Sequence, residues 1–390
     1  MSEQLNYPEY VYVGKGNASM QDDYMDFINY VFGFSGESKD FYKLLPKLYR
    51  PEYDPAASSY VVTEHGKLKA AVGAFSHTLE VCGTELSCVG IGNVAVHPFS
   101  RGKGYMKVTM NMALDDMAKN GVDLTILGGR RARYNYFSYD RAGTTLRFRM
   151  NSDAMRHHFG KDCKPKFTVR KVKRSDEQEL DRIAALSDQQ IFRPIRPREQ
   201  LYDILISWHQ DVYVAYEGDR FVGYLVYGDQ IVNEVQVERE EDFLDLIKSF
   251  YDTIHRDFTV WVPAFRPAFA KQLHRVCEGY DRGCSKMFSV LCFRRVMLAF
   301  LRLKQTYESL PDGEMTFLIH GRAGDEHLTV KIENGVASVE ETDKTPDLEL
   351  DHLDALTLIF ADYCPERIDL PNFAKLWFPL PLYMYNADVV

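Results

Sequence analysis

The sequence predicts an α/β (α+β) protein in which two tandem units with mixed central sheets precede a smaller C-terminal α+β unit. Three observations predict this arrangement. The chain has 390 residues, enough for two or three domains. A diverged internal repeat occupies most of its first three quarters, and the acidic excess lies in the last ninety residues. We therefore expect units at residues 1–155, 156–296 and 297–390.

The internal repeat consists of two strand–turn–strand patterns with a glycine in each turn. Residues 59–75 and 212–227 both have apolar, β-rich runs on either side of a short polar turn. An acidic helical segment precedes each pattern, and Ser19 and Ser175 stand where they would cap these helices. Two copies of one α/β unit are the simplest interpretation, and chance similarity between two generic strand patterns is the alternative.

The last ninety residues differ from the rest in charge and in pattern. They carry 7 basic and 17 acidic side chains, whereas residues 1–150 carry 17 and 16. The Asn334-Gly335 pair is a strong hairpin signal, so we expect a small antiparallel sheet there. The aromatic run 377–385 is too apolar for a frayed tail and should pack as an extended segment. The helices and strands expected in this unit are 295–308, 315–320, 327–333, 335–340 and 353–361.

The composition excludes several classes of protein. Its 45% apolar and 26% charged residues are ordinary globular values, and no stretch approaches the roughly 18 apolar residues of a membrane helix. The first ten residues do not resemble a secretory leader, and seven cysteines without a CxxC pair indicate neither disulfides nor zinc, so we expect a cytoplasmic protein without a metal. The chain has no basic stripe for nucleic acid or membrane, and its acidic balance favours a cationic small molecule.

Residues 94–106 combine the features of an anion-binding loop. A β-branched strand is followed by a proline stop, a glycine-rich turn and an amphipathic helix. Gly102 and Gly104 let a ligand approach the backbone, and N–H groups at a helix start can bind a diphosphate. Arg101 and Lys103 add positive charge. A bare glycine-rich turn would be weak evidence, but these features in this order are much more specific.

This segment resembles the pyrophosphate loop of the GNAT superfamily of N-acetyltransferases, Q/R-x-x-G-x-G/A. Here it is Arg101-Gly102-Lys103-Gly104-Tyr105-Met106, with Met106 in place of the last small residue, a departure expected to alter helix packing more than phosphate binding. The resemblance implies tandem GNAT folds and acetyl-CoA as co-substrate, its pantetheine arm lying between two strands that splay apart. The cofactor-binding residues expected from it are Val94, Ala95, Val96, Arg101, Gly102, Lys103, Gly104, Tyr105, Met106, Tyr134 and Asn135.

The GNAT reaction uses no metal, because a free amine attacks the thioester directly. Backbone N–H groups near Val94 and Val96 are the expected holders of the thioester oxygen. Residues 139–143 look like the family's Y-x-x-x-G segment, whose tyrosine faces the leaving sulfur. A tyrosine is protonated at neutral pH, so Tyr139 is the expected general acid. A packed core aromatic is the alternative interpretation.

The second repeat differs where the loop should be. Residues 238–242 have no glycine and carry four carboxylates, which would repel a diphosphate, so we expect a structural, non-catalytic copy. An active GNAT unit, a degenerate copy and a C-terminal module like the sterol carrier protein fold make the chain similar to the Enhanced intracellular survival (Eis) acetyltransferases. That resemblance implies a hexamer and acceptor amines on aminoglycosides, some peptides and lysine side chains.

The Eis resemblance also implies a base, the carboxylate of the chain's last residue. Here that residue is Val390, and the segment 377–385 could deliver it to the active site. An α-carboxylate has an ordinary pKa of ~3.3–3.7 and is a poor base alone, so it would act through water or mainly orient the ammonium. A terminus merely packed near the cleft is the alternative. His97 follows a strand and precedes a proline, which is typical of a turn residue, and we reject it as the base.

We therefore predict an acetyl-CoA-dependent N-acetyltransferase that acts on a primary amine of a cationic acceptor (aminoglycoside, polyamine or lysine-type) in a ternary complex. An alternative from another class is a carrier of lipid or another apolar ligand, with a vestigial transferase unit. A third possibility is a different acyl donor on the same scaffold. Asp22, Asp23 and Asp26 could bind a cationic acceptor or simply be solvated helix acids. A basic cluster around Tyr139 could meet the CoA 3′-phosphate or the acidic C-terminal unit, within the chain or across subunits, or could be a solvated face: Arg130, Arg131, Arg133, Arg141, Arg147 and Arg149.

Overall fold

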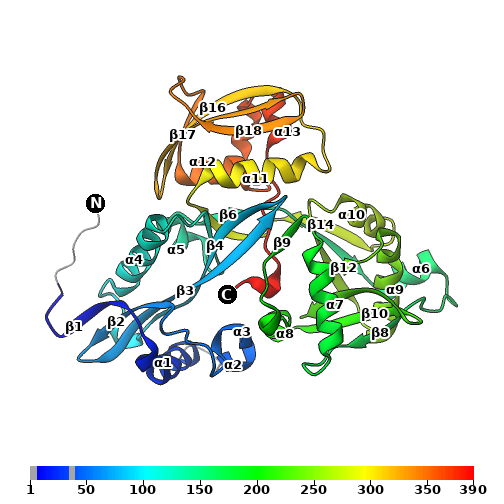
Figure 1. Ribbon diagram of the computed structural model, residues 1–390, viewed down its shortest axis with the longest axis horizontal. Coiled ribbons are helices and arrows are strands. Elements are labelled where there is room, and N and C mark those ends of the chain that lie inside the picture. The colour runs from blue at the N-terminus through cyan, green and yellow to red at the C-terminus, as the bar shows by residue number, and fades with distance from the viewer. Residues whose placement is uncertain (1–6, 35–39) are drawn as a thin grey trace.

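The computed structural model describes residues 7–34 and 40–390 and forms three sheets with helices packed around them. Figure 1 shows three lobes: the first (blue to cyan) and second (green) lie side by side, and the third (yellow to red) lies above both. The predicted fold class, α/β with mixed central sheets, is confirmed. Within the described ranges, no helix combines the length and apolar character needed to cross a membrane.

The first sheet has the strand order β1-β2-β3-β4-β5-β15-β6, and β9 pairs with the end of β3. Its neighbouring strands are antiparallel except β4 and β5, which are parallel. The strands are β1 (Val11–Lys15), β2 (Ser59–Glu64), β3 (Lys67–Val81), β4 (Thr84–Val96), β5 (Leu124–Leu127), β6 (Asp140–Ala142), β9 (Phe192–Pro194) and β15 (Lys286–Val290).

The second sheet repeats this plan strand by strand, in the order β8-β10-β11-β12-β13-β7-β14. It too has one parallel pair, β12 with β13, at the position that β4 and β5 occupy in the first sheet. The strands are β7 (Thr145–Met150), β8 (Thr168–Lys171), β10 (Asp211–Glu217), β11 (Arg220–Gly228), β12 (Ile231–Val237), β13 (Phe258–Pro263) and β14 (Gly279–Gly283).

The two sheets exchange strands, and the short β9 also joins the first sheet from the second segment of the chain. β7, which lies before residue 155, is the sixth strand of the second sheet, and β15, which lies before residue 296, is the sixth strand of the first. The expected bounds at 155 and 296 therefore follow the order of the chain but do not follow the composition of the sheets. A strand pattern predicts an extended segment without predicting which sheet completes its hydrogen bonds, so the exchange was not foreseen.

The third sheet, β18-β17-β16-β19, packs against α11 and α12. The strands expected at 315–320, 327–333 and 335–340 and both expected helices are found with boundaries shifted by a few residues, and β19 was not expected. The strands are β16 (Gly313–Gly321), β17 (Gly324–Glu333), β18 (Val336–Glu341) and β19 (Leu348–Asp351). The helices of the chain are α1 (Gln21–Gly33), α2 (Phe41–Leu44), α3 (Pro46–Tyr49), α4 (Tyr105–Lys119), α5 (Arg131–Tyr134), α6 (Ser152–Phe159), α7 (Glu177–Asp188), α8 (Leu201–Ile206), α9 (Phe243–Ile254), α10 (Pro267–His274), α11 (Phe293–Gln305), α12 (His352–Phe360) and α13 (Asn372–Trp377).

The two expected serine caps are wrong. Asn17 caps the turn before α1, its side-chain oxygen accepting the backbone N–H of Ser19 at 3.0 Å, and α1 begins only at Gln21. α7 begins after Asp176, which makes no side-chain cap bond, so Ser175 lies outside the helix. An asparagine two residues earlier competes effectively for the first free N–H groups of a helix.

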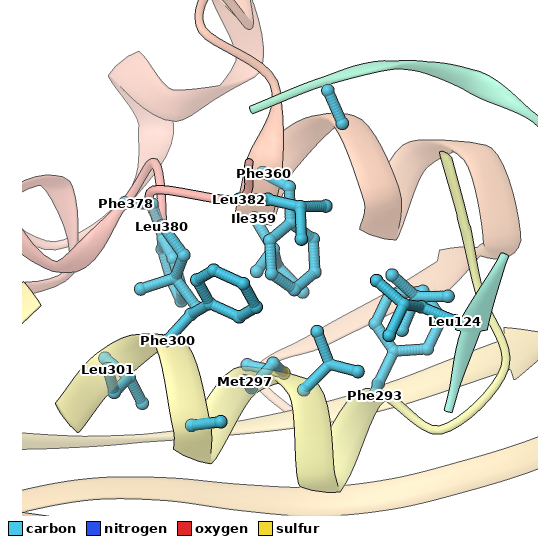
Figure 2. Close-up of a cluster of buried hydrophobic side chains, with 14 of the residues drawn as sticks. Leu124, Phe293, Met297, Phe300, Leu301, Ile359, Phe360, Phe378, Leu380 and Leu382 are labelled. Atoms are coloured by element: carbon cyan, nitrogen blue, oxygen red, sulfur yellow. The ribbon is translucent and has the colours of Figure 1, made fainter. Parts of the chain in front are cut away.

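One large core joins the third lobe to the first sheet. Figure 2 shows Phe293, Met297 and Phe300 on one face of α11, packed against Ile359 and Phe360 of α12. The same core includes Leu124 of β5 and the chain's last segment. This segment, residues 378–390, is called the tail below. All of its residues except Pro379 and Asn386 are buried. In Figure 1 the tail (red) descends from the third lobe and ends between the other two.

Candidate active site

β4 and β5 diverge in the middle of the first sheet. They pair in parallel from Cys88 with Leu124 to Ile91 with Leu127, where β5 ends. A β-bulge follows at once in β4: Asn93 has a φ of 47°, and the register against β3 shifts between Gly92 and Ala95. The bulge bends the strand, so its last residues have no partner on β5. The splayed pair that the GNAT resemblance implies is therefore present.

The loop after β4 offers unpaired backbone donors. Gly102 and Gly104 have φ values of 85° and 78°, which other residues adopt only with strain. Gly104 precedes α4, whose start has no side-chain cap. Within the described residues, the N–H groups of Gly102, Lys103 and Gly104 donate no hydrogen bond. Such groups at a helix start form an anion-binding nest.

A cavity of about 840 Å³ extends from this loop to the splayed end of β4. Of the residues expected to bind the cofactor, Val94, Val96, Arg101, Gly102, Gly104, Tyr105 and Met106 line it. Lys107, Arg130 and Arg133 add positive charge to its wall. The lining also includes residues that were not expected: Ser100 and Lys107 from the loop and α4, and Val31, Phe32, Tyr136 and Phe137. The last four come from α1 and from the turn after β5, which reach the cavity only through the fold.

Four expected cofactor residues lie outside this lining. Ala95 is 1% exposed and packs into the core beneath α1. Tyr134 is buried against α4, and the side chain of Asn135 donates to the carbonyl of Tyr139 at 2.8 Å, which stabilises the turn. Lys103 forms an ion pair with Glu64 of β2 at 2.6 Å.

Glu64 of β2 binds two residues of the loop after β4 and the start of α4. It also accepts a hydrogen bond from the hydroxyl of Tyr105, and the bonds from Lys103 and Tyr105 lower the pKa of its carboxyl. The ammonium of Lys103 therefore fixes the loop to β2.

Tyr139 lies in the core beside β5, outside the lining of the cavity. It is 0% exposed and packs with Ile91 of β4, Leu127 of β5 and Met110 of α4. The hydroxyl of Thr125 donates to its phenol oxygen, which leaves the phenol proton available to another acceptor. Burial raises the pKa of Tyr139, so the phenol stays protonated at neutral pH. These features are compatible with both the general acid and the packed aromatic.

The chain's last residue is seated on glycines of β4. A Cβ added at Gly90 would lie 2.5 Å from Cγ2 of Val390, and one added at Gly92 would lie 3.6 Å from its carboxyl carbon. Gly92 is the first residue of β4 beyond its pairing with β5. Val390 is 8% exposed, and none of the described residues forms a hydrogen bond or ion pair with its carboxylate. The terminus thus brings an unpaired carboxylate to the splay.

The other expected candidates lie elsewhere. His97 caps the turn after β4, where its Nδ1 accepts the N–H of Phe99 at 3.3 Å. Asp22, Asp23 and Asp26 are exposed on α1. None of these four lines the cavity described above.

Lys47 binds the end of the tail from the first lobe. Its ammonium donates to the carbonyls of Ala387 at 2.6 Å and Val389 at 2.8 Å, and Nε1 of Trp208 donates to the same Val389 oxygen at 2.8 Å. Lys47 is 5% exposed, and this burial lowers its pKa to about 7.

The wild-type protein should gain stability relative to Lys47→Met as the pH rises above 7. Between pH 7 and about 10 the unfolded chain holds a proton on Lys47 that the folded chain has lost, so unfolding costs about 1.4 kcal/mol more per pH unit. Below pH 7 both states hold the proton and the difference is constant. Urea unfolding of both proteins at pH 7.5 and 9.5 measures the change, expected at about 2–3 kcal/mol. Parallel pH profiles would contradict it.

Comparison with known proteins agrees with this geometry. The family described as "Acetyltransferase (GNAT) domain" matches residues 14–143, whereas no curated protein matches the sequence. A probable N-acyltransferase of unknown function from Enterococcus faecalis V583 has a TM-score of 0.68 at 16% identity, covering 96% of this chain and 97% of its own. A GCN5-related N-acetyltransferase from Kribbella flavida has a TM-score of 0.68 at 15% identity, covering 97% and 98%.

A third solved structure is Eis1 from Mycobacterium abscessus, with a TM-score of 0.62 at 12% identity, covering 96% of this chain and 98% of its own. At these identities the solved structures establish likeness of fold over nearly the whole chain. The family match is independent of them and covers the splayed strands, the loop and Tyr139. The chain therefore carries a GNAT acetyltransferase domain at residues 14–143 and is an acyl-CoA-dependent acetyltransferase.

Proposed function

We propose that the protein transfers the acetyl group of acetyl-CoA to a primary amine of a cationic acceptor, of the aminoglycoside, polyamine or lysine type, by direct attack in a ternary complex. The observation that carries the proposal is the unpaired carboxylate of the buried residue Val390, at the splay of β4 and β5. A buried carboxylate without a cation is costly, and an incoming ammonium group would supply the missing partner.

In this proposal each part of the site has one task. The N–H groups between Arg101 and Gly104 bind the diphosphate, and Arg130 and Arg133 add charge at the cavity wall. The N–H groups of β4 near Val94 and Val96 polarise the thioester carbonyl, which acetyl-CoA supplies as the electrophile. The Val390 carboxylate orients the ammonium and takes up its proton through water, and Tyr139 returns a proton to the thiolate.

The finer features of the protein rest on the Eis resemblance. They are a non-catalytic second unit at 156–296, a C-terminal unit at 297–390 with a sterol-carrier-protein-like fold, a hexameric assembly and a cytoplasmic location. A role as an apolar-ligand carrier is not favoured, because the cavity of about 520 Å³ on the third lobe is lined by polar and charged residues. Native mass spectrometry of the purified protein tests the assembly state and any bound lipid.

Release of free CoA thiol from acetyl-CoA tests the proposed function. A panel of aminoglycosides, polyamines and lysine peptides should include at least one acceptor that increases thiol release well above the rate without amine. Calorimetry with CoA on the same protein shows whether the donor site is intact. A protein that binds CoA but releases no thiol with any amine would overturn the proposal.

Adding one glycine after Val390 should lower kcat/KM for the amine by roughly 100-fold, because the carboxylate moves by one residue, about 3.5 Å. The matched control inserts one glycine beside Gly335, in the exposed turn between β17 and β18. That insertion should leave both kcat and KM nearly unchanged. Full activity in the extended protein would remove the carboxylate from the mechanism.

A further inference from the structure

The second sheet keeps the splay of the first but not its cavity. β12 and β13 pair in parallel only at Ile231 with Thr259 and Val232 with Val260, and the rest of β12 leaves its neighbour. In the first sheet the equivalent opening belongs to the cavity of about 840 Å³. Between β12, β13 and α10 the remaining space is about 10 Å³. A side chain therefore fills the space between β12 and β13, which corresponds to the proposed acyl-CoA site between β4 and β5.

The filling group is the ring of Tyr385, which belongs to the tail. Tyr385 is 4% exposed and lies beside Glu234 of β12 and Trp261 of β13. Its hydroxyl accepts a hydrogen bond from the side chain of Gln236 at 3.1 Å, and the side-chain oxygen of Gln236 accepts one from Arg266. The cleft of the second lobe is thus occupied by the chain itself.

A buried guanidinium ties the tail to the same cleft. Arg196 donates from Nε and Nη2 to the carboxylate of Asp388 at 2.9 and 2.6 Å, and from Nη1 and Nη2 to Glu234 at 3.0 and 2.7 Å. The three side chains are 2–4% exposed. The hydroxyl of Tyr224 donates to Glu234 at 2.6 Å. Because two bonds join the guanidinium to each carboxylate, they fix both the position and the orientation of the Asp388 side chain, which a single bond would not.

The ion pair of Arg196 with Asp388, called the anchor below, lies close to the terminus in sequence. Asp388 precedes Val390 by two residues, so the chain between their Cα atoms spans at most roughly 7 Å. Upstream, Lys286 donates to the Asn386 side chain at 2.9 Å, and Lys304 donates to the carbonyls of Trp377 and Pro379 at 3.2 Å each. These two lysines therefore hold the tail further from its end. Asp388 is the only aspartate or glutamate among residues 378–390.

We propose that Arg196, held by Glu234, is a positioning residue that grips Asp388 and so aims the Val390 carboxylate at the acceptor amine. The second lobe then contributes to catalysis without binding acyl-CoA: its cleft holds the tail of the chain instead. This inference rests on the proposed function, because it assigns to the anchor the placement of the group that meets the amine.

The test uses Asp388→Ala in the full chain, because this change leaves Arg196 and Glu234 as a neutral pair. The terminus would then be held only by the bonds of Lys47 and Trp208 to its main chain, so carboxypeptidase A should release valine at least tenfold faster. With an accepted amine, kcat should fall at least tenfold while the KM for acetyl-CoA stays within threefold. Glu234→Gln, which leaves Asp388 in place and weakens only the support of Arg196, should change both readouts in the same direction by less.

The matched control is Asp242→Ala. Asp242 is also a buried aspartate of the second lobe with two cationic partners, Lys166 and Arg220, but it lies at the start of α9 and neither ion pair includes a residue of the tail. It should lower the melting temperature as much as Asp388→Ala without changing valine release or kcat. Unchanged valine release in Asp388→Ala overturns the anchor, and faster release with unchanged kcat overturns the positioning role. Valine release needs no acetyl transfer, so it tests the anchor even if every amine fails and the proposed function falls.

Discussion

Replacing Gly102 with aspartate should lower the affinity for CoA at least about 100-fold, a loss of roughly 2.7 kcal/mol of binding free energy. Gly102 has a φ of 85°, so any side chain there strains the turn that presents the free N–H groups of the loop. The carboxylate would also lie where the diphosphate is expected and would repel it. The strain disfavours the loop conformation that binds, and the charge opposes the bound diphosphate, so isothermal calorimetry with CoA measures their sum.

The matched control for this prediction is Gly335→Asp. Gly335 has a φ of 75° in the turn before β18, and a Cβ at either glycine would meet no atom within 4 Å. The two variants therefore share the same backbone strain and the same added charge, and both should fold. Only the change at position 102 should weaken CoA binding. Equal affinities for Gly102→Asp and the wild type would show that the diphosphate binds elsewhere.

The sequence was sufficient for the local parts of the site. A strand end, two glycines and a helix start follow one another in the chain, so their geometry depends on neighbouring residues, and the loop and the splay are found where they were expected. The repeat was equally visible because each copy is continuous for most of its length. Seven of the eleven expected cofactor residues line the cavity for this reason.

The parts that depend on distant pairing could not be predicted in the same way. The exchange of β7 and β15 and the ion pair of Lys103 with Glu64 join segments that no local pattern connects. The tail was expected to be packed, but its filling of the second cleft needs Arg196 and Glu234, whose charges would ordinarily indicate a solvated surface. Burial of a charged residue depends on its partner, and a single sequence does not reveal that partner.

Two roles are open to Tyr139, a general acid and a packed core aromatic, and they predict different effects of removing its hydroxyl. The ring is fully buried, and Thr125 of β5 donates to its oxygen, so the phenol proton is left for another acceptor. A residue that only packs there would lose one hydrogen bond on conversion to phenylalanine, about 1 kcal/mol of stability, with little effect on turnover. A general acid would lose its proton, and the thiolate would have to leave without one.

We expect Tyr139→Phe to lower kcat by roughly 100- to 10,000-fold while the dissociation constant of CoA changes less than about threefold. Burial raises the pKa of Tyr139, so the wild-type rate should show no loss of this acid up to pH 9. Tyr213→Phe is the control, since that tyrosine packs on Phe250 in the second lobe, away from the cavity. Thiol release and calorimetry on both variants separate the effects on turnover and binding. If Tyr139→Phe keeps the wild-type kcat, the phenol is a core side chain and the thiolate takes its proton from water.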